Sequence, residues 1–365
     1  DFDDFDEGED VVASDIAPTA ADVFETMTLM HLEAGRITER DLADLDPGNM
    51  PQVPLEEMSD QDRAQWLAFA AYQFCFEDPE GASEMADQAL SYDEFCIDAY
   101  VALWFLEETE SEEAIALAAQ AAIRGQHLID ATKESRQLTD LWMYPRLRGV
   151  VRAYAALALS NWAYGNHDDA IEAAEHVLKL APHDDVGITP YLANWYLVTG
   201  QKKRAHRLLR EYTVEGSAAV EYARALVAFV REGPQKARAA LRMAVERHPM
   251  ILAFMMPSPD EELASEGGRY PSHYYSPGTW EDVAVWQALV EETWRSVPGA
   301  LGWAVERVKE PDFAALLAEG MMDASDTVAR MLAQEGLDPD GPIDGYGSDA
   351  EDDDDPAGDP ELRLL

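Results

Sequence analysis

The sequence predicts an all-α protein whose antiparallel helix pairs stack side by side into an α-solenoid. The first observation is a repeat of about 34 residues in the middle third of the chain, at 161–182, 195–210 and 227–249. The second is a glycine at the expected turn of each repeat: Gly165, Gly200 and Gly233. The third is an alanine four or five residues after each glycine: Ala170, Ala205 and Ala237. Because one helix pair cannot bury its own apolar face, such repeats stack on their neighbours.

The composition fits a folded protein without a membrane span. The chain has 365 residues, of which 47% are apolar, so it can build a sizeable core. It contains no uninterrupted apolar run of eighteen residues, the length that would suggest a spanning helix. Its first ten residues are acidic and lack the basic-then-apolar order of a signal peptide. We therefore expect no membrane association.

The two cysteines indicate a reducing compartment. Cys75 and Cys96 are 21 residues apart, and each lies inside an apolar helical run. A disulfide framework or a metal site would need more ligands at closer spacing. We expect a pair of buried thiols and a cytoplasmic location, or a nuclear one in a eukaryote.

The net charge of −45 is concentrated at the two ends of the chain. Residues 1–62 hold 19 acidic and 2 basic residues, and residues 338–365 hold 11 acidic and 1 basic residue. Residues 139–250 hold 12 acidic and 15 basic residues. A salt-adapted, acid-rich proteome is the alternative explanation, but uniform adaptation would not leave the centre slightly basic. The pattern favours a basic partner or masking of the core by the chain's own ends.

The N-terminal part is predicted to be a tail, a helix and a linker. Residues 1–18 are rich in Asp and Glu and are expected to form an acidic disordered tail. Residues 19–60 form an N-terminal helical segment and linker. The helix has apolar residues at helical spacing and ends at Gly35, and the linker covers 46–58.

The central part, 61–250, is predicted to consist of helical repeats. Early helix pairs are expected at 66–76 with 81–91 and at 96–107 with 112–124. Residues 125–145 are an irregular insertion with a short helix. Three clearer repeats then follow at 151–182, 188–212 and 218–249.

Residues 251–337 are predicted to be a helical cap that closes the open apolar end of the stack. Thr279 and Asp282 resemble a capping box that opens a long helix. Shorter helices are expected at 300–309 and 312–334. Residues 338–365 are expected to be a second acidic disordered tail. The apolar face of the long helix is formed by Val283, Trp286, Val290, Trp294 and Val297.

The repeats resemble tetratricopeptide repeats (TPRs). The match covers residues 61–250 and is clearest in the repeat that contains Tyr154, Leu157, Gly165, Ala170 and Pro182. Ala237 and Pro249 keep the same Ala-to-Pro spacing one repeat later. The run Tyr274-Tyr275-Ser276-Pro277-Gly278, followed by a tryptophan-bearing helix, is also similar to TPR proteins of the suppressor-of-tumorigenicity type, a resemblance that implies no activity.

The resemblance implies that the first helix of each pair lines a concave groove where a ligand lies. Ala155 and Leu159 stand where the family's chaperone-tail receptors carry clamp residues, so the groove is expected to hold an amphipathic helix or an extended apolar segment. The alternative is that part of this stripe is core between repeats. The groove residues carried over are Arg152, Leu159, Trp162, Asn194, Leu197, Tyr222, Leu226 and Phe229.

Catalytic, metal and nucleic-acid sites are not indicated. Lys203, Arg207 and Arg210 share one helical face, but this short basic stripe is more typical of a solvated face or a contact for the acidic tail. His167 and His183 lie at opposite ends of one predicted helix and cannot share an ion. No phosphate-binding glycine loop, nucleophile elbow or metal motif is present. We expect no enzyme activity and no cofactor.

The sequence therefore favours a protein-binding TPR adaptor, or a dedicated chaperone, for a basic client held in the groove. Two alternatives remain open. In one, the acidic ends imitate a nucleic acid and occupy the cleft of a nucleic-acid-binding protein. In the other, the chain is a structural subunit that docks through Trp286 and Trp294. The client and the oligomeric state are not predicted.

Overall fold

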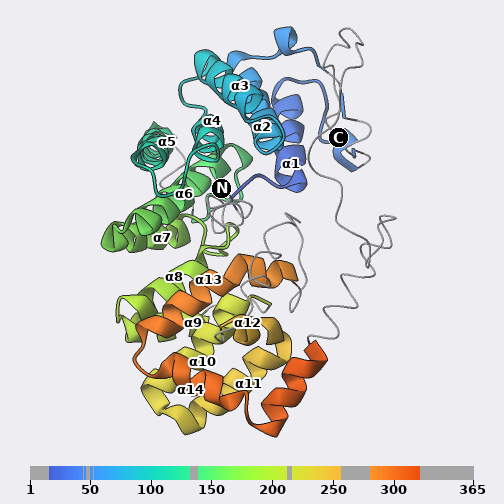
Figure 1. Cartoon of the computed structure of the whole chain (residues 1–365). Coiled ribbons are helices and arrows are strands. Elements are labelled where there is room, and N and C mark those ends of the chain that lie inside the picture. The colour runs from blue at the N-terminus through green and yellow to red at the C-terminus, as the bar shows by residue number, and fades with distance from the viewer. Residues whose placement is uncertain are drawn as a thin grey trace, which may run out of the picture.

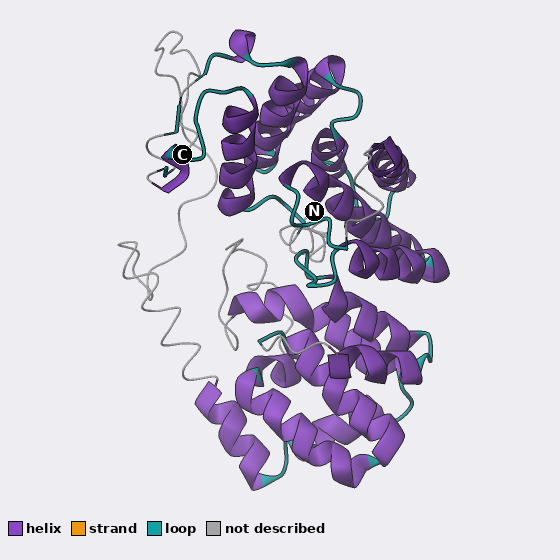
Figure 2. Ribbon diagram, turned by 180° about the vertical axis from the view of Figure 1, so that it is seen from behind, coloured by secondary structure: helices purple, strands orange, loops and turns teal. Residues whose placement is uncertain are grey.

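The computed structural model describes residues 16–320 except 44, 47–49, 52, 132–138, 212–215 and 256–279. All regular structure in this part of the chain is helical (Figures 1 and 2). The helices pack in neighbouring pairs, as in an α-solenoid. The predicted all-α class is therefore confirmed. Both predicted acidic tails lie outside the described residues, apart from 16–18.

Five helix pairs form the centre of the protein, and each pair is joined by a short turn. One helix precedes the pairs, and a short helix and two longer ones follow them. Residues 311–320 are also helical. The helices are α1 (Ala20–Glu33), α2 (Asp60–Phe74), α3 (Pro79–Tyr92), α4 (Ile97–Trp104), α5 (Glu112–Ala131), α6 (Arg148–Tyr164), α7 (His167–Leu180), α8 (Ile188–Val198), α9 (Lys202–Glu211), α10 (Ala218–Glu232), α11 (Pro234–Arg247), α12 (Pro249–Phe254), α13 (Trp280–Ser296) and α14 (Ala300–Arg307).

The packing order is that of stacked hairpins. Each second helix contacts its own first helix and also the first helix of the next pair. The first helices α2, α4 and α6 also contact one another in turn, as do α8 and α10. The first helices thus form an inner row and the second helices α3, α5, α7, α9 and α11 an outer row. Figure 1 shows the pairs from α2–α3 to α6–α7 in the upper part of the molecule and the pairs α8–α9 and α10–α11 in the lower part.

Small residues let the two rows approach closely. The alanines that follow the repeat glycines, Ala170, Ala205 and Ala237, are fully buried, as are Ala114 and Ala118 of α5. The turns contain a left-handed backbone conformation that most residues avoid and glycine tolerates. Gly165 and Gly200 adopt it, with φ values of 93° and 76°. The glycine and alanine positions therefore set the spacing of the repeats, as the sequence predicts.

Three details differ from the sequence predictions. Ile16, expected in the disordered tail, is buried in the core at 2% exposure. Helix α5 extends to Ala131, so the first part of the expected insertion is helical. Helix α12 begins at Pro249 and continues the stack beyond the last predicted repeat. In each case a local apolar run is buried against neighbouring helices, although its own pattern is too short to predict this.

The cysteines are free and buried, as predicted. Cys75 and Cys96 form no disulfide. Burial raises the pKa of both thiols, and that of Cys96 strongly. No helix in the described ranges is long and apolar enough to cross a membrane.

Asp184 caps helix α8 from a left-handed backbone position with φ of 59°. Its carboxylate accepts hydrogen bonds from the backbone N–H groups of Ile188 (2.7 Å) and Thr189 (2.9 Å). Burial nevertheless raises the pKa of Asp184 to about 6, from its usual 3.8. The stability that Asp184 contributes is therefore fully present below pH 4 and is lost as the pH rises through 6.

We expect this titration to appear in a comparison with Asp184→Asn, which keeps an oxygen acceptor and tolerates the left-handed backbone. Between pH 7 and pH 4 the free energy of unfolding of the natural chain should rise by roughly 2–3 kcal/mol relative to the variant. Urea unfolding of both proteins at the two pH values measures this difference. If the difference in free energy of unfolding between the two proteins did not change with pH, the raised pKa of Asp184 would be contradicted.

Candidate protein-binding surfaces

The stack has an N-terminal half, α1 to α7, and a C-terminal half, α8 to α14. The inner row of the C-terminal half is covered by the chain's own helix α13. This helix packs on α8, α10 and α12, and it contacts none of the outer helices to a comparable extent. Its apolar face is buried there, with Trp294 fully buried and Trp286 2% exposed. The ring of Trp286 lies 5.3 Å from that of Tyr191, and the ring of Trp294 lies 6.4 Å from that of Tyr222. The predicted docking face of this helix is therefore not accessible, and that prediction was wrong.

The residues predicted to line an open groove are mostly core. Six of the eight are buried, and the other two are half-buried against aromatic neighbours. The groove does not exist as a free surface because α13 fills it and because part of the stripe packs between repeats. The buried six are Arg152, Leu159, Asn194, Leu197, Tyr222 and Leu226, and the half-buried two are Trp162 and Phe229.

The polar groups of this stripe bind the protein's own backbone. Tyr222 donates its hydroxyl hydrogen to the carbonyl of His248 at 2.9 Å. The side-chain amide of Asn194 donates to the carbonyls of Pro190 (2.8 Å) and Ala219 (3.3 Å). These contacts tie α8 to α10 and α10 to the start of α12. Hydrogen-bonding groups that could recognise a guest are thus used in packing.

Trp162 joins the two halves of the stack. Its ring stacks on that of Trp195 in α8 at 4.8 Å and on that of His167 at 4.1 Å. Glu292 of α13 lies close to Trp162 and His167, and burial raises the pKa of this carboxyl group. His167 therefore has a packing role, which agrees with the structural reading of this histidine in the sequence.

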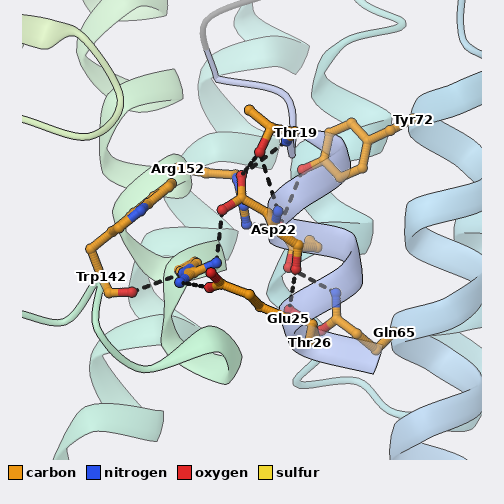
Figure 3. Close-up of polar contacts among 10 residues, drawn as sticks. Thr19, Asp22, Glu25, Thr26, Gln65, Tyr72, Trp142 and Arg152 are labelled. Carbon is orange, nitrogen blue, oxygen red and sulfur yellow. Dashed lines mark hydrogen bonds and ion pairs between the residues drawn. The ribbon is translucent and has the colours of Figure 1, made fainter. Parts of the chain in front are cut away.

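The inner row of the N-terminal half carries a buried network of charges (Figure 3). Arg152 of α6 lies between two carboxylates, 3.1 Å from Asp98 of α4 and 3.3 Å from Asp22 of α1. Arg148 pairs with the same Asp22 at 2.8 Å and with Glu25. Helix α1 is thus attached to the inner face through its carboxylates.

Further polar contacts extend the network to α2. Arg146 pairs with Glu33 at the end of α1 and, at 2.9 Å, with Asp62 of α2. The amide of Gln65 donates to Asp98 at 2.9 Å. Each arginine therefore has acidic partners from other helices, which offsets the cost of burying its charge.

A small cavity adjoins this network. Its volume is about 40 Å³, and its lining includes Gln65, Phe95, Cys96, Asp98 and Arg146. Such a volume holds one or two water molecules, whereas small-molecule sites usually enclose roughly 300 Å³ or more. This cavity is therefore not a ligand site. No group of three potential metal ligands lies together in the part of the chain that the structure describes.

One edge of the N-terminal half is strongly acidic. The ends of α2 and α4 adjoin there, since the rings of Tyr72 and Phe105 lie 5.4 Å apart. The end of α6 adjoins the start of α5, since the Tyr164 hydroxyl donates to Glu112 at 3.0 Å. We call this surface the acidic edge. Its exposed carboxylates are Glu77, Asp78, Glu80, Glu107, Glu108, Glu110, Glu112, Glu113, Asp168 and Asp169.

The carboxylates of the acidic edge stand without counter-ions in the described part of the chain. Within the described ranges none of the ten forms an ion pair with Lys or Arg. Two large side chains lie exposed among them, Phe76 at 53% and Tyr164 at 45%. This surface is not among those predicted from the sequence, although residues 77–113 hold thirteen acidic residues and no Lys, Arg or His.

The outer helix α9 carries the opposite charge. Lys202, Lys203, Arg207 and Arg210 are exposed, and we call them the α9 stripe. The fifth cation of this helix, Arg204, instead pairs with Glu175 and lies over the ring of Tyr196.

Comparisons of the chain with family models, with curated proteins and with solved structures give no match. Function is therefore inferred from the surfaces described above.

Proposed function

We propose that this protein is a non-enzymatic, protein-binding scaffold built from tetratricopeptide repeats, and that its partner is a basic protein. The acidic edge is the observation that carries the proposal. It presents ten exposed carboxylates, none of which pairs with Lys or Arg in the part of the chain that the structure describes, and it includes two exposed aromatic side chains. The repeat register of Gly165, Ala170 and Pro182 supports the assignment to tetratricopeptide repeats.

The physics of such a surface suits capture of a basic segment. Carboxylates grouped on one edge create a negative potential that attracts a positive partner over about one Debye length, roughly 8–10 Å at physiological salt. Charge complementarity of this kind mainly raises the association rate and the specificity. Phe76 and Tyr164 add apolar contact area, which long-range attraction alone does not provide.

The proposed binding surface is the acidic edge and not the inner groove that the repeats predict. The inner row is covered by α1 in one half and by α13 in the other, whereas no described helix covers the turns that form the acidic edge. An adaptor or dedicated chaperone would thus receive its client on the edge. The reduced, buried thiols support a cytoplasmic location for this function.

A charge-neutralised variant tests the proposal. We expect Glu77→Gln, Glu80→Gln, Glu107→Gln, Glu108→Gln and Glu110→Gln together to weaken binding of a fluorescent lysine-rich peptide about tenfold at 50 mM salt, since five of the ten edge charges are removed. The difference from the natural chain should shrink at 500 mM salt. Fluorescence anisotropy measures both affinities.

A matched control separates the acidic edge from the total charge. It neutralises five other exposed glutamates that form no ion pair in the described ranges, and it should change the affinity less than twofold. Equal weakening by both variants would mean that net charge alone attracts the peptide, which would contradict a localised site. The control positions are Glu39, Glu56, Glu94, Glu211 and Glu319.

Mimicry of a nucleic acid is the second candidate, and the unpaired carboxylates of the edge favour it as well. Phosphate imitation needs charge but no aromatic contact. Replacing Phe76 and Tyr164 by serine would leave binding unchanged under mimicry, and it should weaken binding of a basic peptide that also carries apolar residues under the adaptor proposal. The same anisotropy assay distinguishes the two.

A further inference from the structure

The α9 stripe groups four cations of the C-terminal half on one helix. Its four side chains are exposed, and none forms an ion pair within the described ranges. Two arginines of α11 are instead neutralised by the chain itself. On α11, Arg238 pairs with Glu310 and Asp312 at 2.7–2.8 Å, and Arg242 pairs with Glu246 at 3.7 Å. The stripe therefore offers a positive surface that has no ion-pair partner among the residues that the structure describes.

The stripe follows one side of α9, where cations outnumber the nearby acidic residues Glu175, Glu211 and Glu232. Lys203, Arg207 and Arg210 follow one another at helical spacing, so their side chains project from the same side of α9. Arg231 of α10 lies close enough to His206 to act on it electrostatically, as does Arg210. Glu232 is the acidic residue that acts there in the opposite sense. The local potential is therefore positive on a protein whose net charge is −45.

We propose that the α9 stripe binds the acidic segment 349–355 of the same chain. This segment carries six carboxylates in seven residues, at Asp349, Glu351 and Asp352 to Asp355. It is complementary in sign to the four cations, and its density of charge suits a row of side chains along about two helical turns.

Tethering favours this occupant over a separate anion. The segment begins 29 residues after Gly320, and a chain of that length can span up to roughly 95 Å when extended. A tethered ligand has an effective concentration on the order of millimolar. A free nucleic acid, or the acidic edge of a second copy, must instead approach a body that repels it by its net charge. Occupation of the stripe leaves the acidic edge as the charged surface that a partner meets.

Carbodiimide coupling of the full-length chain tests the contact, because this reagent joins a carboxylate to an amine without a spacer. The described residues include five lysines, and Lys179, Lys236 and Lys309 serve as internal references. We expect mass spectrometry to find links from 349–355 concentrated on Lys202 and Lys203 at 50 mM salt. Lys309 is nearer in sequence, so simple proximity along the chain would favour it instead. The preference should fall at least fivefold at 500 mM salt.

A charge-reversal variant keeps the reactive amines and removes the attraction. Arg207→Glu with Arg210→Glu should reduce links to Lys202 and Lys203 at least fivefold, since both lysines remain but the stripe loses its net positive charge. The control, Arg40→Glu with Arg295→Glu, reverses two exposed arginines elsewhere and should leave the links unchanged.

Two results would overturn the proposal. One is the absence of a preference for the stripe. The links would then spread evenly over all exposed lysines, or Arg207→Glu with Arg210→Glu would not alter them. The other is a predominance of links between light and heavy chains in an equal mixture of unlabelled and ¹⁵N-labelled protein, which would identify a second copy as the occupant. Neither result depends on whether the acidic edge binds a basic partner.

Discussion

Replacing Arg152 by alanine should lower the free energy of unfolding by about 3–5 kcal/mol. The guanidinium is 1% exposed and lies between Asp98 and Asp22, with its centre 5.2 Å from the ring of Trp142. Without it, Asp98 keeps hydrogen bonds from neutral groups only, from Gln65 and from Tyr72, so a charge is left buried without a counter-charge. The midpoint of urea unfolding, followed by circular dichroism, measures the loss.

Arg204 provides a matched control for this prediction. It also has an ion pair and an aromatic contact, with Glu175 and Tyr196, but its side chain is 38% exposed. Exposed pairs contribute about 0–1 kcal/mol, so Arg204→Ala should cost far less than Arg152→Ala. The double variant Arg152→Ala with Asp98→Asn should recover part of the loss, because it removes the orphaned charge. Equal costs for both arginines would show that the buried network does not stabilise the N-terminal half.

The repeat architecture could be predicted because its determinants are local. A turn that needs positive φ selects a glycine, such as Gly165, and a close helix crossing selects an alanine, such as Ala170. Helical periodicity then fixes the remaining boundaries to within a few residues. The face of α13 could be predicted as apolar for the same reason, since Trp286 and Trp294 follow helical spacing.

The location of α13 could not be predicted, because periodicity gives the direction of a face but not the surface that it covers. An apolar stripe on α8 and α10 and an apolar face on α13 are each compatible with an external partner, and the structure packs them on one another. The family resemblance predicts an open groove and gives no indication that α13 covers it.

The sequence contains patterns that indicate the buried charge network and the acidic edge, but they do not identify the interacting residues. Arg148 and Arg152 are four residues apart in an otherwise apolar helix, which indicates cations that point toward buried partners. Their partners on α1 are more than 120 residues away in sequence, and no local rule relates them. The acidic edge does not appear in a charge count over long end segments, because it is formed by separate turns that stacking brings together.

Trp294→Ala is the second substitution with a large expected effect, and it addresses the closure of the inner face. The side chain is fully buried between Tyr222 of α10 and Trp303 of α14, with ring centroids 6.4 Å away in both cases. Removing a buried tryptophan leaves a large cavity and should cost about 3–5 kcal/mol in the free energy of unfolding. Urea unfolding measures this, and Tyr144→Ala, which removes an aromatic ring that is 43% exposed, should cost less than about 0.5 kcal/mol.

The same variant should loosen α13 from the inner row before the whole chain unfolds, because this helix buries its apolar face on α8 and α10 and Trp294 is a central part of that face. We expect amide hydrogen exchange of α13 to accelerate at least tenfold more than that of α2 and α3, which belong to the other half. We also expect binding of the dye ANS to rise, since the apolar stripe of α8 and α10 would become accessible. Uniform acceleration over both halves would show that α13 is inseparable from one cooperative core. Under selective loosening, the concave groove expected from the repeats exists in this protein only when α13 has left it.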